Sequence, residues 1–233
     1  MPTERRCGTT MRDAVLFDLD NTLFDVEQYM RGAFADVARH LAAEHNVDCE
    51  RVQEDLLLVW RKKTSMYSHL FDDIVEDYGI DADIEQIVAV FNDHEPTLSP
   101  YEGVPELLNR LSNTGYILGI ITDGTARRQR RKLDALGLRS MFETVVLTAE
   151  VGEAKPSPLP FKQAARHLDR ATDQCIYIGD NPQVDFQGPK DIGMATIRLR
   201  YGEFQERLTT SKVDKTVNDV SDLYEAIVHL SAD

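Results

Sequence analysis

The sequence contains little cysteine and no long hydrophobic run, and each absence excludes a class of protein. Its three cysteines (Cys7, Cys49 and Cys175) are far apart and lack metal-ligand spacing, so we expect reduced, structural thiols. No apolar stretch approaches the roughly 18 residues that a transmembrane helix requires. The N-terminus is polar and has no apolar signal segment, which predicts a cytoplasmic address, with residues 1–12 forming a flexible tail.

The sequence also lacks a long basic block, and its 40 acidic residues outnumber its 26 basic ones. The formal net charge is −14, which argues against binding of nucleic acid and against an anionic membrane surface. A small anionic substrate is compatible with this charge, because a metal ion and one or two lysines can reverse the field locally. With 42% hydrophobic residues among 233, the chain can bury the core of one medium domain, or of one domain that carries a smaller insertion.

The spacing of apolar residues indicates two kinds of structure. Residues 26 to about 95 show helical spacing in segments at 26–41, 52–61, 66–78 and 84–91. Elsewhere short β-prone runs alternate with helical segments of about ten residues. The strands are expected at 14–17, 116–121, 144–147, 175–178 and 195–199, and the helices at 104–111, 126–136, 158–168, 184–192 and from about 221 onward.

This alternation predicts an α/β fold with a doubly wound, parallel, Rossmann-like sheet. Seventy residues of helix after the first strand are too many for a simple crossover and predict an inserted helical bundle. We therefore expect a core formed by residues 13–25 and 97–233 and a helical domain formed by residues 26–96. Residues 202–219 are expected to form a polar loop, and Ser221 is expected to cap the last helix.

Two carboxylates follow the first strand directly. Asp18 and Asp20 are two residues apart, so in an extended chain they share one face. Ligands bind at the carboxyl edge of such sheets. Two adjacent carboxylates repel each other unless a cation or a shared proton lies between them, and Mg²⁺ prefers such oxygen ligands. Taken alone, the pair also fits an Asp-rich turn after a core strand.

Three further strand ends carry complementary polar residues. Thr122 offers a hydroxyl beside backbone N–H groups, and Gly124 allows a close approach before a helix N-terminus that favours an anion. Lys155 can neutralise a phosphoryl oxygen. Asp180 and Asp185 add carboxylates that make little sense without a cation. The four strand ends together therefore indicate a metal-assisted site for a phosphorylated ligand.

The ordered motifs D-L-D-N-T, T-D-G, K-P-S-P and G-D-N-P-x-x-D resemble those of the haloacid dehalogenase-like hydrolase superfamily. They span residues 18–185, and each follows a predicted strand or a strand and turn. The helical insertion resembles that superfamily's helical cap placed after the first strand. The motif variants resemble the phosphatase branch, in which phosphoglycolate-phosphatase-like, nucleotidase-like and sugar-phosphate-phosphatase-like members are not separated by these residues.

The resemblance implies a hydrolase of phosphoric monoesters that acts on a small phosphorylated metabolite through an aspartyl-phosphate. Asp18 would be the nucleophile, and Asp20 the general acid and then the general base. The remaining implied roles are phosphate binding by Thr122, Asp123, Gly124, Lys155 and Asn21, with backbone N–H groups from Asn21 and Gly124, and Mg²⁺ binding by Asp18, the Asp20 carbonyl, Asp180 and Asp185.

Three alternatives share this fold. A phosphomutase returns the phosphoryl group to its intermediate, and no distinctive cap signature favours it. A 2-haloacid dehalogenase needs no metal and usually lacks the second Asp of the first motif, so Asp20, Asp180 and Asp185 argue against it. A non-catalytic binding protein is the third, because fold alone does not guarantee activity. The expected assembly is a monomer or a homodimer.

Overall fold

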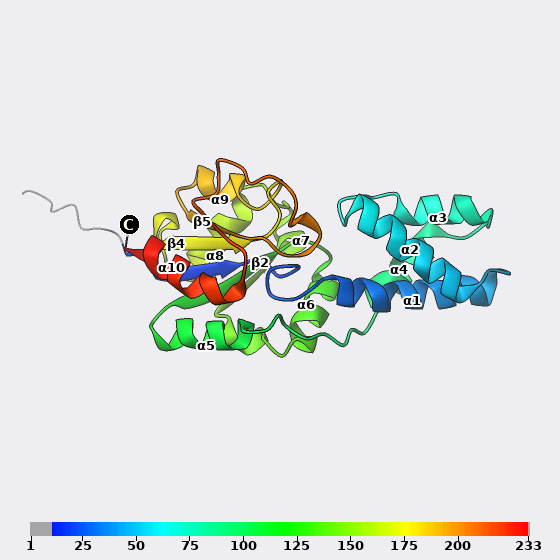
Figure 1. The fold of residues 1–233 in the computed structure, drawn as a ribbon, viewed down its shortest axis with the longest axis horizontal. Coiled ribbons are helices and arrows are strands. Elements are labelled where there is room, and N and C mark those ends of the chain that lie inside the picture. The colour runs from blue at the N-terminus through cyan, green and yellow to red at the C-terminus, as the bar shows by residue number, and fades with distance from the viewer. Residues whose placement is uncertain (1–10, 233) are drawn as a thin grey trace, which may run out of the picture.

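A computed structural model describes residues 11–232, and its centre is one six-stranded sheet in the order β3-β2-β1-β4-β5-β6 (Figure 1). All neighbouring strands run parallel. Such an order requires a crossover between successive strands, as in a doubly wound sheet. The strands are β1 (Ala14–Phe17), β2 (Ile117–Thr122), β3 (Thr144–Leu147), β4 (Cys175–Gly179), β5 (Ala195–Leu199) and β6 (Lys215–Val217).

Helices cover both faces of this sheet. Alternate residues of β1 point to opposite faces, so Val15 and Phe17 belong to the buried cluster that includes side chains of α5, α6 and α10. Ala14 and Leu16 belong to the other cluster, which includes α8. The helices of this part are α5 (Val104–Asn113), α6 (Ala126–Ala135), α7 (Thr148–Val151), α8 (Leu159–His167), α9 (Gln187–Asp191) and α10 (Leu223–Ser231).

Four helices follow β1 and lie beyond one end of the sheet (Figure 1). The longest, α1, packs against both α2 and α4. The rings of Phe34 in α1, Phe71 in α3 and Phe91 in α4 are in contact with one another and form part of the apolar centre of this segment. The division of the chain into a core and a separate helical domain stays a prediction. The four are α1 (Glu27–Glu44), α2 (Cys49–Lys63), α3 (Leu70–Tyr78) and α4 (Ile84–Asp93).

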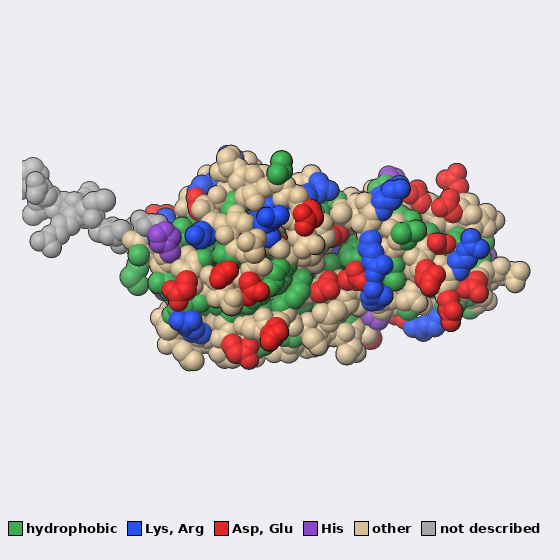
Figure 2. Space-filling view, in the orientation of Figure 1, with side chains coloured by type: hydrophobic (Ala, Val, Ile, Leu, Met, Phe, Trp, Pro, Cys, Tyr) green, Lys and Arg blue, Asp and Glu red, His purple; other side chains and the backbone are tan. Residues whose placement is uncertain are grey.

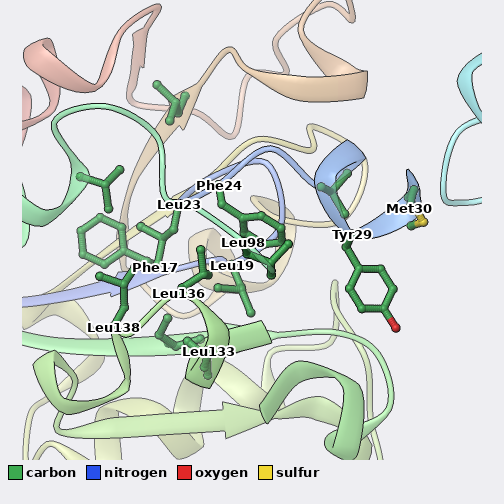
Figure 3. Close-up of a cluster of buried hydrophobic side chains, with 14 of the residues drawn as sticks. Phe17, Leu19, Leu23, Phe24, Tyr29, Met30, Leu98, Leu133, Leu136 and Leu138 are labelled. Carbon is green, nitrogen blue, oxygen red and sulfur yellow. The ribbon is translucent and has the colours of Figure 1, made fainter. Parts of the chain in front are cut away.

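The loop between β1 and α1 is held by buried apolar side chains (Figure 3). Leu19, Leu23 and Phe24 are all at most 1% exposed. Asn21 adopts a positive φ of 58°, and its side-chain oxygen accepts a hydrogen bond from the Val26 N–H. A loop anchored in this way holds the intervening polar side chains in place, and Asp18 and Asp20 are two of these.

Several predicted boundaries are wrong. The segment predicted as helix at 66–78 begins only at Leu70, because Thr64 has a positive φ of 67° and a turn joins the Tyr67 N–H to the Thr64 carbonyl. The helix predicted at 184–192 is shortened to Gln187–Asp191, since residues 181–185 form a tight turn.

The C-terminal third contains two further corrections. The region predicted as a polar loop includes β6, a three-residue edge strand whose polar sequence gives no apolar signal. Ser221 does not cap α10, whose N-cap residue is Asp222 and which has no side-chain capping hydrogen bond. Asp219 instead caps the short 3-10 turn Val220–Asp222 just before it, by accepting a hydrogen bond from the Ser221 N–H. Both features depend on residues that lie far from them in sequence or on local turn geometry.

Within residues 11–232, no helix is long and apolar enough to cross a membrane. Cys49 and Cys175 are free thiols there, as expected, whereas Cys7 and the first ten residues of the predicted tail lie outside the described residues. On the face drawn in Figure 2, lysine and arginine occur in small groups between acidic side chains rather than as one continuous basic surface.

Candidate active site

Side chains from β1 and β4 and the loops that follow them meet Lys155 at the carboxyl edge of the sheet. Its Nζ lies 2.7 Å from Asp18 Oδ1 and 2.7 Å from Asp185 Oδ1, and it donates a third hydrogen bond to the Tyr177 hydroxyl at 3.2 Å. The side chains of Lys155, Asp18 and Asp185 are 4%, 8% and 0% exposed. A buried lysine with two carboxylate partners stays charged, and its pKa is raised well above the usual value because these attractions outweigh the cost of burial.

The acids around this lysine form a cluster that fits a cation. Asp18, Asp180 and Asp185 each offer a carboxylate oxygen, and these oxygens all lie within 4.8 Å of one another. Asp180 Oδ2 is buried and has no hydrogen-bond partner among the described residues. A buried, unpartnered carboxylate oxygen beside two other acids is a site that a hard divalent cation satisfies.

The protonation equilibria of these acids reflect the same crowding. Burial raises the pKa of Asp18, Lys155 opposes this shift, and the negative charge of Asp185 adds to it. The net result is a pKa of about 7. Burial and the charges of Asp185 and Asp18 raise the pKa of Asp180 well above its usual value. A bound cation would remove the repulsion that keeps protons on these groups.

Asp20 has a different environment although it is only two residues from Asp18. Lys132 Nζ lies 2.7 and 2.9 Å from its two oxygens, and Gln129 Nε2 donates to Oδ2 at 3.0 Å. Burial opposes ionisation of Asp20, but these partners outweigh it and lower its pKa. Burial lowers the pKa of Lys132 to about 8, and Asp20 opposes that shift. Asp20 is therefore held as a carboxylate.

The loop after β2 lies against α6, which begins at Ala126. Thr122 Oγ1 accepts a hydrogen bond from Gln129 Nε2 at 2.6 Å, and Gly124 has a φ of +116°, which favours glycine. The carboxylate of Asp123 accepts hydrogen bonds from Thr148 Oγ1 at 2.6 Å and from the Lys155 N–H at 3.2 Å. Asp123 thus braces the loop through its side chain, which leaves its backbone as the part available to a phosphate.

One implied contribution, from the Asn21 backbone, is engaged within its own loop in this structure. The resemblance assigned the backbone N–H of Asn21 to the phosphate, but that N–H donates to the Phe24 carbonyl at 2.9 Å. With its side chain also engaged by Val26, Asn21 shapes the loop instead.

A cavity of about 360 Å³ lies in front of these residues. Both parts of the molecule line it, since Met30, Ser65 and Met66 come from the four-helix segment and its loops. The backbone N–H of Ser65 donates to Glu203 Oε2 at 2.8 Å across the cavity mouth. Every residue assigned to the site by its motif lines this cavity: Asp18, Asp20, Asn21, Thr122, Asp123, Gly124, Lys155, Asp180 and Asp185.

Sequence reasoning missed four functional candidates at this cavity. Arg128 and Lys132 line it, and Gln129 is buried behind it. These three belong to the charged segment 127–132, whose composition is typical of a solvent-exposed helix. Helical spacing nevertheless places residues 128, 129 and 132 on one side of the helix, and this side faces the site. Arg127 points outward to an ion pair with Asp93. Glu203, which also lines the cavity, carries no motif signal.

Parallel strands that gather three buried carboxylates and a lysine at one edge define an α/β protein equipped for chemistry on an anionic group. A family model described as haloacid dehalogenase-like hydrolase matches residues 15–199, so the chain belongs to this family. The family, the enzyme class of phosphatase-type hydrolase and the fold predicted from the motifs are thereby confirmed.

Named relatives share most of the chain. A glyceraldehyde 3-phosphate phosphatase from Methanopyrus kandleri is 32% identical over 203 residues, which cover 84% of this chain and 87% of the relative. A protein of the same name from Methanocaldococcus jannaschii is 28% identical over 228 residues, or 96% and 100% of the two chains. The solved structure of a Bacillus subtilis HAD-hydrolase bound to magnesium has a TM-score of 0.69 at 18% identity, with 93% and 99% coverage.

Proposed function

We propose that this protein is a Mg²⁺-dependent phosphatase that hydrolyses a small phosphomonoester through an aspartyl-phosphate intermediate. The observation that carries the proposal is the unpartnered Asp180 oxygen beside Asp18 and Lys155. That arrangement offers a nucleophile, a cation site and a fixed positive charge within one small cavity. The phosphatase names of the relatives support the same reaction class.

In the first step, a carboxylate oxygen of Asp18 attacks phosphorus and the bond from phosphorus to the substrate oxygen breaks. Lys155 already binds Oδ1, so we assign the attack to Oδ2. The leaving oxygen takes a proton from the carboxyl group of Asp20, which has to gain that proton as the anionic substrate binds. Its loss returns Asp20 to the carboxylate that Lys132 and Gln129 stabilise. We assign binding of the phosphoryl oxygens to Thr122 and to backbone N–H groups of the following loop, whose residues line the cavity.

In the second step, water attacks the phosphorus of the aspartyl-phosphate. The Asp20 carboxylate accepts a proton from this water, the bond between phosphorus and Asp18 breaks, and inorganic phosphate leaves. Asp18 and a protonated Asp20 are regenerated. The contacts of Asp20 with Lys132 and Gln129 suit this second step, because they stabilise the carboxylate form.

The residues that would hold Mg²⁺ are Asp18, Asp180 and Asp185 through their carboxylates and Asp20 through its carbonyl. When bound, the ion would shield the anionic nucleophile from the anionic substrate and stabilise the charge of the transition state. The cluster of acidic oxygens and the orphan oxygen of Asp180 support this assignment.

The size of the cavity favours a short substrate. About 360 Å³ lies near the lower limit for ligand pockets, and the relatives' names point to a three-carbon sugar phosphate. We infer that the four-helix segment acts as a cap, since its residues Ser65 and Met66 close one side of the cavity and would exclude water during the reaction. The cytoplasmic address and the monomeric or homodimeric assembly stay predictions.

The test measures release of inorganic phosphate from p-nitrophenyl phosphate and from glyceraldehyde 3-phosphate, with Mg²⁺ and with EDTA. We expect activity that needs the metal and disappears in Asp18→Asn. Asp134→Asn, on an exposed position of α6, is the matched control and should behave as the wild type. Activity that survives in EDTA or in Asp18→Asn contradicts the proposal. A phosphorylated product in place of free phosphate would indicate a phosphomutase.

A further inference from the structure

One face of α6 supplies every side-chain hydrogen bond that the carboxylate of Asp20 receives among the described residues. Lys132 contributes two, at 2.7 and 2.9 Å, and Gln129 contributes one at 3.0 Å. The two donors are three positions apart, and both are fully buried, at 1% and 0% exposure. Leu133 beside them is buried in the same apolar cluster as Leu19 (Figure 3), which fixes α6 against the loop that carries Asp20.

The contacts of Lys132 direct most of its ammonium group at Asp20. An ammonium group has three N–H donors, and the two oxygens of Asp20 take two of them. The ring of Tyr29 in α1 lies 4.6 Å from Nζ, within cation–π range, and occupies the remaining side. Tyr29 is itself held by a hydrogen bond from its hydroxyl to the Phe91 carbonyl at 2.9 Å. The ammonium is therefore directed at Asp20 from a fixed position.

Gln129 connects the same carboxylate to the phosphate loop. Its amide nitrogen donates to Asp20 Oδ2 and to Thr122 Oγ1, at 3.0 and 2.6 Å. The reverse orientation of the amide would bring its oxygen against the negative carboxylate, so the orientation is set by charge. Thr122 accepts this hydrogen bond, and its own hydroxyl proton makes only a long contact of 3.5 Å to the Asp123 carbonyl, so we infer that it turns to a phosphoryl oxygen when substrate binds.

We propose that Lys132 and Gln129 are positioning residues that hold the Asp20 carboxylate beside Asp18 and direct the hydroxyl proton of Thr122 toward the substrate. The inference rests on the proposed phosphatase function and adds to it a device that none of the four motifs contains. Since a misplacement of about 1 Å at a reacting group can cost about 10²-fold in rate, loss of this support should slow turnover more than it weakens binding.

The kinetic test compares Lys132→Met with the wild type on p-nitrophenyl phosphate. Methionine has a similar length and removes the charge. We expect kcat to fall by about 10²-fold while KM changes by less than about threefold. Arg130→Met is the matched control on the same helix, since Arg130 is exposed and pairs with Glu150, and it should keep wild-type kcat. An unchanged kcat, or a KM raised tenfold with kcat kept, would make Lys132 a bystander or a substrate ligand and overturn the proposal.

Crystal structures of Lys132→Met and Gln129→Met give a readout that does not depend on activity. We expect the Asp20 side chain to leave its wild-type position in the first and Thr122 or Asp20 to shift in the second. If Asp20 and Thr122 keep their places in both variants, positioning by α6 is disproved whatever the rates are. Absence of phosphatase activity in the wild type would instead count against the proposed function, and these structures would still decide the inference.

Discussion

Asp18 and Asp20 are separated by one residue, yet their surroundings shift their pKa values in opposite directions. On the Asp18 side, three acids share one lysine, and burial raises the pKa of Asp18 to about 7. On the Asp20 side, a lysine and an amide surround a single acid, and they lower its pKa in spite of burial. Identical side chains can therefore take different roles in a reaction, because the surrounding charges separate their protonation equilibria.

The difference also shows what each side lacks. The Asp18 side brings three buried acids to one lysine, an excess of acidic groups that a bound cation would balance. The Asp20 side is balanced within the chain itself. One half of the site would therefore be balanced by a metal ion, whereas the chain itself balances the other half. This contrast makes four predictions.

Lys155→Met should have the largest effect, because it removes the sole side-chain cation in contact with Asp18 and Asp185 among the described residues. We expect activity to fall by at least about 10²-fold and the metal-free protein to lose about 3–5 kcal/mol of unfolding free energy. Urea denaturation in EDTA measures the second effect. Lys190→Met, which breaks a partly exposed ion pair with Asp214, is the control and should cost about 0–1 kcal/mol. Equal losses in the two variants would show that the Asp18 side is not short of positive charge.

Asp180→Asn should separate stability from function. It removes one of three mutually repelling carboxylates, so we expect the metal-free protein to gain on the order of 1 kcal/mol while activity falls by about 10²-fold. Thermal unfolding with and without Mg²⁺ measures the change. In the wild type, saturation at a hundred times the dissociation constant should add about 2.7 kcal/mol, and most of this gain should vanish in the variant. A full Mg²⁺ response in Asp180→Asn would remove Asp180 from the metal site.

The stability of the metal-free protein should depend on pH through Asp18. Its pKa is about 7 in the folded chain against an ordinary value of 3.8, so between these values the folded chain holds a proton that the unfolded chain has lost. This group therefore makes stability fall as pH rises from about 4 to about 7. Asp20, with its lowered pKa, acts in the opposite sense and loses its contribution as pH falls below its usual range.

Melting temperatures in EDTA across this range, for the wild type and for Asp18→Asn, measure the Asp18 contribution as the difference between the two curves. We expect the wild type to lose stability relative to the variant as pH rises, and we expect Mg²⁺ to stabilise the wild type more at pH 8 than at pH 5. Parallel curves for the two proteins would show that Asp18 ionises normally and would break the contrast with Asp20.

Glu203→Gln should have the smallest effect. Glu203 lies at the mouth of the cavity, where burial raises its pKa and where hydrogen bonds from Ser65 lower it. Glutamine keeps an oxygen that can accept the Ser65 N–H and removes the charge. We expect the affinity for Mg²⁺, followed by titration calorimetry, to change by less than about threefold, since a partly solvated charge is screened. A change of tenfold would add Glu203 to the acids of the Asp18 side. Exposed Glu206→Gln is the control.

The polar residues at the strand ends could be recognised from the sequence for a simple reason. Buried parallel strands appear as short apolar runs, and the residue after each run lies at the same sheet edge. Asp18 and Asp180 directly follow such runs and could therefore be assigned to this edge. Lys155 and Asp185 lie further along the connecting segments and were grouped with them because their charges are complementary. The four helices after β1 were also recognised, because apolar residues at three- and four-residue steps need no knowledge of the partner surface.

What the sequence determined by itself is therefore the fold class and which residues reach the sheet edge, since both follow from local periodicity. Only the tertiary structure decided which charged side chains pair with each other. Lys132 lies 112 positions from Asp20, and nothing in its basic helical run shows that one face turns inward. The engagement of the Asn21 N–H, the start of α3 at Leu70 and the edge strand β6 likewise depend on contacts or turns that local patterns do not encode. Pairing across the fold, rather than composition, gives two neighbouring aspartates their opposite environments.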